Sequence, residues 1–116
     1  MKVLFIDDDS MMLRMASFIM KKGGHQAVTA ESGAEGIELI KENAPDVVFI
    51  DVEMPGMNGF ETLEALNAEG ALSGTRVYMM SGTVTGDVES QAKSLGAAGV
   101  IDKPLNAAEV LGAVNG

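Results

Sequence analysis

The sequence predicts an α/β fold of the doubly wound class, in which five parallel strands form one sheet and helices cover both of its faces. Three observations favour this class. Five short apolar runs alternate with segments of helical character along the chain. The runs are apolar at nearly every position, which is typical of parallel strands that are buried on both faces. No repeat, low-complexity segment or shift in composition divides the 116 residues, so we expect one domain.

The expected strands are runs of branched or bulky apolar residues. In chain order they cover residues 3–6, 27–29, 47–50, 77–80 and 100–101, of which the second is the weakest and the fifth is short. A segment of helical character follows each run, so the chain consists of a βα unit repeated five times. Ligands of such sheets bind outside the carboxyl ends of the strands, which locates the functional edge before any motif is considered.

The first two helices have recognisable ends. The first covers residues 10–22, where Lys21 and Lys22 suit the negative end of the helix dipole and two following glycines can supply a left-handed stop. The second begins after Ser32, which forms the pattern of a capping box with Glu35, and it ends at residues 43–45.

The last three helices are shorter. One is expected at residues 59–68, with apolar residues three apart and Gly70 as the terminator, and the next covers roughly residues 86–95. The final helix opens at Asn106, which resembles the cap of a capping box because Glu109 follows three residues later.

The charge balance excludes several classes of function. The chain contains eight basic and 17 acidic residues, and the resulting formal net charge of −9 should repel nucleic-acid backbones and anionic membranes. The chain has no cysteine, which rules out disulfides and cysteine-bound zinc. The apolar run at the start is too short for a signal peptide or a membrane span, so we expect a cytoplasmic protein.

The nine methionines allow two interpretations. A methionine-rich surface can bind partners promiscuously, but filling of the core is the commoner use of this flexible side chain. We therefore interpret the methionines, among them Met11, Met12, Met15 and Met20, mainly as core residues.

Chemically capable side chains follow four of the five strands. Because the carboxyl ends of parallel strands meet at one edge, these groups should converge there: Asp7, Asp8 and Asp9 after the first strand, Asp51 after the third, Ser81 after the fourth and Lys103 after the fifth. Scattered surface charge would not select the same end of four strands.

Converging carboxylates repel one another and therefore favour a hard divalent cation, for which an oxygen-rich site with room for water suits Mg²⁺. Such a metal keeps open positions that phosphate oxygens can fill, and Lys103 and Ser81 could bind further phosphate oxygens. An aspartate can attack phosphorus to form a labile aspartyl phosphate, a bond suited to a switch. Charge alone does not identify the nucleophile, but Asp51 stands alone after the most apolar strand, whereas Asp7 and Asp8 look like metal ligands.

Four sequence blocks in this order and spacing resemble the response-regulator receiver domains: Ile6-Asp7-Asp8, the segment 49–59 around Asp51, Ser81-Gly82 and Lys103-Pro104. The resemblance covers the whole chain and implies a receiver domain at residues 1–116, with no effector domain. It also implies a flavodoxin-like (βα)5 fold with strand order 2-1-3-4-5.

The resemblance further implies a role for each site residue. Asp51 would accept a phosphoryl group from a histidine kinase or a histidine phosphotransfer protein, with Mg²⁺, for which Mn²⁺ can substitute, on Asp8, Asp51 and the backbone carbonyl of Glu53. Asp7 would assist the metal. Lys103 would pair with the acyl phosphate, and Ser81 would swing toward it and switch the face formed by the fourth helix, fifth strand and fifth helix. Such a protein is not an enzyme, because it catalyses only its own phosphorylation and dephosphorylation. The resemblance does not identify its downstream target protein.

The sequence departs from the family pattern at Val100, where the family usually has an aromatic residue whose rotation reports the switch. In addition, Glu53 follows the acceptor by two residues and Thr83 follows Ser81 by two, so both side chains could tune hydrolysis of the phosphate.

Three alternatives remain at this point. The first is an interaction module of the same fold that is never phosphorylated, suggested by Val100 and Glu53. The second is a small haloacid-dehalogenase-type phosphatase, because Asp7-Asp8-Asp9 contains the spacing of that nucleophile loop, although no later acidic motif is found. The third is an FMN-binding protein, which the three carboxylates after the first strand disfavour because they would repel a phosphate.

Overall fold

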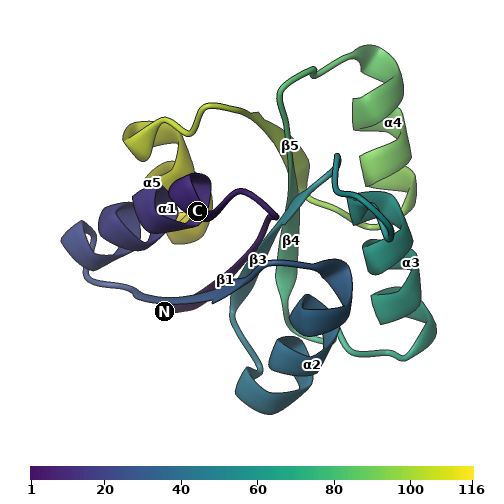
Figure 1. The fold of residues 1–116 in the computed structure, drawn as a ribbon, viewed down its shortest axis with the longest axis horizontal. Coiled ribbons are helices and arrows are strands. Elements are labelled where there is room, and N and C mark those ends of the chain that lie inside the picture. Colours follow the sequence, from purple (N-terminus) through teal and green to yellow (C-terminus); the bar gives the residue numbers. More distant parts are fainter.

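The computed structural model describes residues 1–116, in which strands and helices alternate along the chain (Figure 1). The strands are β1 (Lys2–Ile6), β2 (Gln26–Ala30), β3 (Val47–Asp51), β4 (Arg76–Ser81) and β5 (Gly99–Asp102). The helices are α1 (Ser10–Lys22), α2 (Gly33–Asn43), α3 (Gly59–Ala68), α4 (Gly86–Ser94) and α5 (Ala107–Asn115). All neighbouring strands pair in parallel in the order β2-β1-β3-β4-β5, which confirms the fold class and the strand order.

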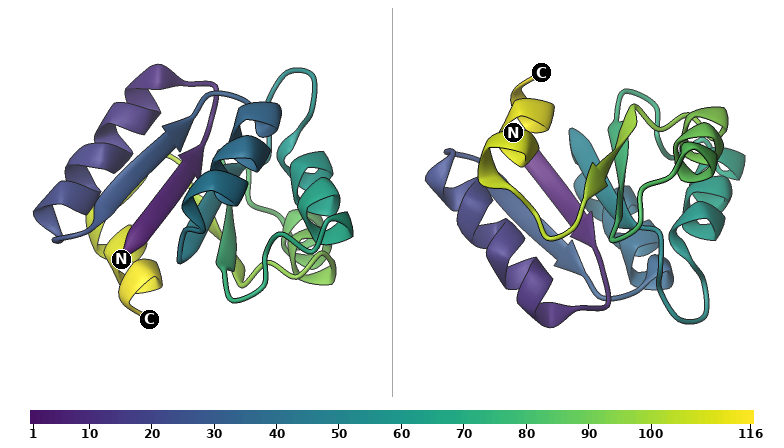
Figure 2. Two further views of the ribbon diagram at one scale, coloured as in Figure 1. Left: turned by 90° about the horizontal axis from the view of Figure 1, so that it is seen from below. Right: turned by 90° about the horizontal axis from the view of Figure 1, so that it is seen from above.

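The sheet forms the middle of three layers. Helices α1 and α5 lie on one face and α2, α3 and α4 on the other, as Figures 1 and 2 show. Alternation along the strands supplies both cores, because Val3 and Phe5 of β1 point toward α1 and α5 while Leu4 and Ile6 point toward the opposite layer. The N-terminal amine contacts His25, which contacts Asn115, so both chain ends lie at the same end of the molecule.

Burial of the strands depends on their position in the sheet. Every residue of β3 is buried, and β1 is buried from Val3 onward, as their continuous apolar sequence predicts. The edge strand β2 is buried only at Ala30, which explains its weaker apolar run. In β5 only Ile101 is buried, because this short strand forms the other edge. The apolar rule for buried parallel strands therefore holds for the centre of the sheet only.

Three aromatic rings form a row across the central strands. The rings of Phe5 and Phe49 stack with centroids 4.8 Å apart, and those of Phe49 and Tyr78 stack at 5.4 Å. These residues are also direct register partners between β1, β3 and β4. Because a shift by one residue would move each ring to the other face, the row fixes the register that aligns the carboxyl ends of the strands.

The capping interactions differ in part from the expectation. Ser32 caps α2 as predicted, but the Glu35 carboxylate accepts the N–H of Glu31 rather than that of Ser32, so the reciprocal bond of the capping box is absent. A complete capping box occurs instead at α3, where Asn58 and Glu61 exchange both bonds. At α5, Asn106 caps the helix through the N–H of Glu109 without a reciprocal bond.

The interpretation of the methionines as core residues is wrong for part of α1. Met12 and Met20 are buried against the sheet, but 73% of Met11 and 45% of Met15 is exposed. Phe18 is exposed as well, and the spacing of these three residues places them on one outward stripe of the helix. None of the helices is both long enough and apolar enough to span a membrane.

Candidate functional site

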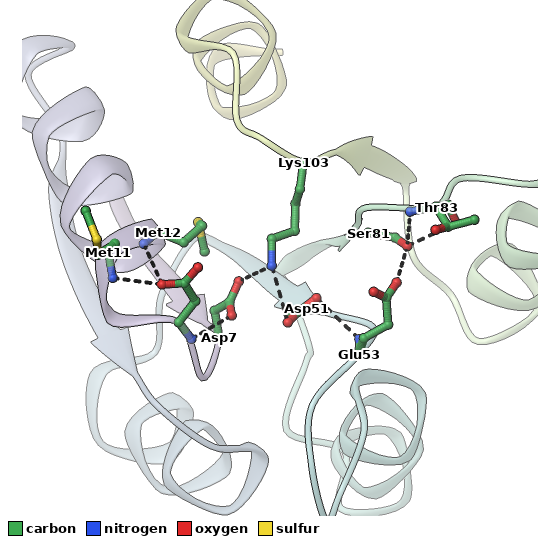
Figure 3. Close-up of polar contacts among 9 residues, drawn as sticks. Asp7, Met11, Met12, Asp51, Glu53, Ser81, Thr83 and Lys103 are labelled. Carbon is green, nitrogen blue, oxygen red and sulfur yellow. Dashed lines mark hydrogen bonds and ion pairs between the residues drawn. The ribbon is translucent and has the colours of Figure 1, made fainter.

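The carboxyl edge of the sheet gathers the side chains that the sequence singles out (Figure 3). Asp51 and Ser81 are the last residues of β3 and β4, while Asp7 and Lys103 directly follow β1 and β5. Backbone hydrogen bonds extend the strand pairing through these positions, from Asp7 N–H to Ala30 and from Lys103 N–H to Ser81. The sheet itself therefore holds the reactive groups side by side.

Three carboxylates form an acidic group at this edge. One oxygen each from Asp7, Asp8 and Asp51 lies within 4.8 Å of the others, and Asp7 and Asp51 are buried whereas Asp8 is exposed. Three converging carboxylate oxygens that are open to water on one side suit a hard divalent cation such as Mg²⁺, which binds oxygen and retains water ligands. The donor set therefore fits the cation that the sequence predicts.

Lys103 lies over the two buried carboxylates. Its Nζ atom is 2.8 Å from Asp7 Oδ2 and 3.4 Å from Asp51 Oδ2, and Figure 3 shows the ammonium between the two aspartates. Burial lowers the pKa of Lys103, but the hydrogen bond to Asp7 and the charges of Asp51 and Asp7 raise it further, so the net shift is upward. The lysine consequently remains a cation at this site.

The pKa of Asp51 is raised to about 7, mainly because burial disfavours its charge and because Asp7 is close. Lys103 opposes this shift, as does the backbone N–H of Glu53, which donates to Asp51 Oδ1 at 3.3 Å. A further cation beside Asp51 would favour the ionised carboxylate, which is the nucleophilic form.

On the β4 side, a second set of contacts surrounds Ser81. The Ser81 Oγ atom lies 2.5 Å from a carboxylate oxygen of Glu53 and 3.0 Å from the carbonyl oxygen of Thr83, and the Thr83 N–H donates back to it. The Glu53 side chain therefore reaches from the end of β3 to β4. The sequence does not predict the hydrogen bond between Glu53 and Ser81, because an exposed glutamate side chain can adopt many rotamers.

Two further residues near the site have structural roles. Asp9 does not join the acidic group; its carboxylate caps α1 by accepting the N–H groups of Met11 and Met12. Gly59 begins α3 directly beside the end of β3, where a Cβ atom would overlap with the carbonyl oxygen of Asp51. Its need for glycine could not be inferred from one sequence, which shows a glycine but not the neighbour that requires it.

A groove of about 360 Å³ opens beside Lys103. It lies between the start of α1 and the loop after β5, and its walls include Asp9, Met11, Met12, Met15, Lys103 and Leu105. Its apolar side is continuous with the exposed stripe of α1, and its polar end reaches the lysine over Asp51.

Residues 3–115 match the family model described as the response regulator receiver domain. The chain belongs to this family. It is 31% identical over 117 residues to protein PilH of Pseudomonas aeruginosa, covering 98% of this chain and 94% of PilH. It is also 35% identical over 115 residues to chemotaxis protein CheY of Bacillus subtilis, covering 98% and 94% of the two chains.

Solved receiver structures agree with this membership. Chemotaxis protein CheY4 of Vibrio cholerae superposes with a TM-score of 0.92 at 29% identity, covering 98% of this chain and 95% of that one. The receiver domain of the Francisella response regulator 1452 gives a TM-score of 0.90 at 27% identity, with 98% and 93% covered. The fold is therefore the flavodoxin-like fold of CheY, and the chain is a receiver domain of the two-component signalling type.

Receiver domains bind Mg²⁺ at a cluster of aspartates, and the Asp7, Asp8 and Asp51 group of this receiver corresponds in kind to such a cluster. Val100 of this receiver lies half-buried on β5, packed against the core that α4 shares with the sheet. A valine has no large ring to rotate between a buried and an exposed position, so this receiver contains no aromatic side chain there to report a switch.

Proposed function

We propose that this receiver is a signalling switch in which Asp51 accepts a phosphoryl group from a phosphohistidine of a histidine kinase or histidine phosphotransfer protein. The observation that supports the proposal most strongly is the position of Asp51: a buried carboxylate at the end of β3, 3.4 Å from the Lys103 ammonium and within the acidic group. A purely structural aspartate has no need of two further carboxylates beside it, which cost free energy to bring together.

In the transfer step, a carboxylate oxygen of Asp51 attacks phosphorus. The new O–P bond forms as the N–P bond to the donor imidazole breaks, and the imidazole nitrogen takes the bonding electron pair and a proton from water. Lys103 is already in place to pair with the phosphoryl oxygens, because its ammonium lies beside Asp51 before the donor arrives. Hydrolysis later reverses the switch when water attacks phosphorus and releases inorganic phosphate.

The metal ligands in this proposal are the carboxylates of Asp7, Asp8 and Asp51 and the backbone carbonyl of Glu53. A bound Mg²⁺, or Mn²⁺ in its place, supplies positive charge that offsets the repulsion between the acidic group and the incoming phosphoryl oxygens. Asp7 also holds Lys103, and its second oxygen accepts the N–H of Asp9 at 2.9 Å, which fixes the carboxylate at the bottom of the site.

In this proposal, Ser81 transmits the phosphorylation state to the surface formed by the elements that follow it in the chain. Movement of Ser81 toward the phosphoryl group would displace the loop that leads to α4 and change the face formed by α4, β5 and α5 for a protein partner. The receiver is then a cytoplasmic switch that performs only its own phosphorylation and dephosphorylation. The charge of −9 argues against nucleic acid and anionic membranes as direct partners.

The exposed stripe of α1 suits the donor protein. Met11, Met15 and Phe18 are exposed apolar side chains on one side of the helix, and the adjoining groove ends at Lys103 beside Asp51. A donor helix with an apolar face that packed on this stripe would bring its phosphohistidine to the acceptor. Met11 and Met15 adapt well to such a partner, because methionine is flexible and polarisable.

Phosphorylation of the isolated protein tests the proposal. We would incubate the protein with Mg²⁺ and acetyl phosphate and measure the intact mass of the wild type and of Asp51→Asn. The proposal requires one phosphoryl group on the wild type and none on the variant or in the presence of a metal chelator. If no donor modifies the wild type and beryllofluoride does not bind at Asp51 either, the protein is an interaction module that is not phosphorylated.

A further inference from the structure

The Ser81 hydroxyl is occupied by Glu53. It is a buried group, and its hydrogen-bond partners are the Glu53 carboxylate and the backbone of Thr83, as Figure 3 shows. A hydroxyl has one proton to donate, so it cannot bond both the carboxylate and the Thr83 carbonyl at once. The distance of 2.5 Å to Glu53, against 3.0 Å to Thr83, assigns that proton to the carboxylate.

Glu53 contacts both halves of the site. Its backbone N–H donates to Asp51 at 3.3 Å, while its side chain reaches across to Ser81 on the neighbouring strand. The backbone bond keeps Glu53 beside the acceptor. The carboxylate of an exposed residue, by contrast, is free to turn away into water when a competing group appears.

We propose that the Glu53 side chain is a positioning residue that holds the Ser81 hydroxyl away from Asp51 until a phosphoryl group arrives. This inference rests on the proposed function and adds a residue that acts through Ser81 without touching the phosphoryl group. We call the bond between the Glu53 carboxylate and the Ser81 hydroxyl the Glu53–Ser81 latch.

The charge of the phosphoryl group opens the latch. A phosphoryl group on Asp51 adds negative charge and several strong acceptor oxygens next to Glu53. These oxygens compete for the single proton of Ser81, and their charge repels the Glu53 carboxylate. Both effects act in the same direction, so the latch closes in the resting protein and opens in the phosphorylated one. Switching must therefore overcome the free energy of the latch.

Repulsion alone is the competing explanation. A carboxylate near the site would weaken the binding of any anionic group at Asp51, whether or not it holds Ser81. The two explanations differ in their dependence on Ser81, because the latch acts only through that hydroxyl. A double-mutant cycle separates a coupling between two side chains from independent effects.

The experiment measures the affinity of the Mg²⁺-loaded protein for beryllofluoride, which mimics the phosphoryl group, by amide NMR titration. The four proteins are the wild type, Glu53→Ala, Ser81→Ala and the double variant. The latch predicts that Glu53→Ala tightens binding about tenfold in the presence of Ser81, a change that corresponds to about 1.4 kcal/mol, and much less in its absence. Glu53→Gln is the matched control: it removes the charge but keeps an acceptor for Ser81, so the latch predicts a smaller gain than for alanine.

If Glu53→Ala tightens beryllofluoride binding equally with Ser81 present and in the Ser81→Ala background, the latch is wrong and charge repulsion is the explanation. That result would leave the proposed phosphorylation of Asp51 intact. The latch is also wrong if Glu53→Gln tightens binding as much as Glu53→Ala. Failure of the wild type to bind beryllofluoride would instead contradict the proposed function itself. Amide spectra of the free proteins check that each variant is folded before titration.

Discussion

Lys103 donates a hydrogen bond of 2.8 Å to Asp7, a residue that is 96 positions away in the sequence and on the other side of β3. The bond ties the ends of β1 and β5 together across β3 and β4, so the lysine neutralises a buried carboxylate as well as facing Asp51. The Lys103 ammonium is therefore held beside Asp51 by its bond to Asp7.

Removal of this ammonium should destabilise the protein. Lys103→Met leaves Asp7 and Asp51 buried without their cation, and we expect a loss of about 2 kcal/mol in the free energy of unfolding. Mg²⁺ should restore part of the loss because it neutralises the same carboxylates. Urea denaturation at about pH 8, with and without Mg²⁺, measures both effects.

The control for this variant is Lys41→Met. Lys41 pairs with Glu69 at 2.6 Å, but both side chains are more than 40% exposed, so the change should alter stability by less than about 0.5 kcal/mol. Equal effects of the two substitutions would show that burial of the Lys103 pair adds nothing.

The raised pKa of Asp51 predicts a pH-dependent effect of Asp51→Asn in the absence of metal. The unfolded chain ionises this group near its usual value of 3.8, whereas the folded protein does so only near 7. Ionised Asp51 therefore lowers the free energy of unfolding of the wild type by a growing amount as the pH rises from about 4 to about 7. Above about pH 7 the loss is complete and constant. Asp51→Asn should be more stable than the wild type by the order of 2–4 kcal/mol at about pH 8 and nearly equal to it at about pH 4.

Urea midpoints of both proteins across this range provide the measurement. A difference in stability that stays constant from about pH 4 to about pH 8 would contradict the shifted ionisation of Asp51. In that case any gain in stability would come from better packing of the amide.

The exposed stripe of α1 predicts a donor-specific defect. Met11→Asp puts a charge into the surface on which the donor helix is proposed to pack, so transfer from a phosphorylated donor protein should slow by about tenfold or more. Transfer from acetyl phosphate should stay within about twofold, because this small donor needs no docking surface. Ala68→Asp adds the same charge on an exposed part of α3 and should leave both rates unchanged. Equal slowing with both donors would contradict a docking role for the stripe.

Gly59 should tolerate no side chain. A Cβ atom there overlaps with backbone and side-chain atoms of Asp51 and Met79, so we expect Gly59→Ala to lower the unfolding free energy by about 2 kcal/mol or more. Gly86 begins α4 in the same way but has open space around it, and Gly86→Ala should be neutral or slightly stabilising. Thermal unfolding compares the two. Similar midpoints would show that α3 can move away from β3.

The parts of the site that depend on topology could be predicted from the sequence. Strand ends in a parallel sheet meet at one edge, so Asp7, Asp51 and Lys103 had to converge once the five apolar runs were identified. The Glu53–Ser81 latch could not, because it depends on the rotamer of one exposed side chain. The exposure of Met11 and Met15 did have a signal. The buried residues Met12, Leu13, Ala16, Ile19 and Met20 form one helical face toward the sheet, and Met11 and Met15 lie outside that face.

Chemical mapping of the phosphorylated residue separates Asp51 from the neighbouring aspartates. Borohydride reduces an aspartyl phosphate to homoserine, so reduction of the phosphorylated protein, proteolysis and peptide mass spectrometry locate the modified position. The proposed switch requires homoserine at position 51 and unmodified Asp7, Asp8 and Asp9. Homoserine at any of these three positions, with Asp51 unchanged, would contradict it.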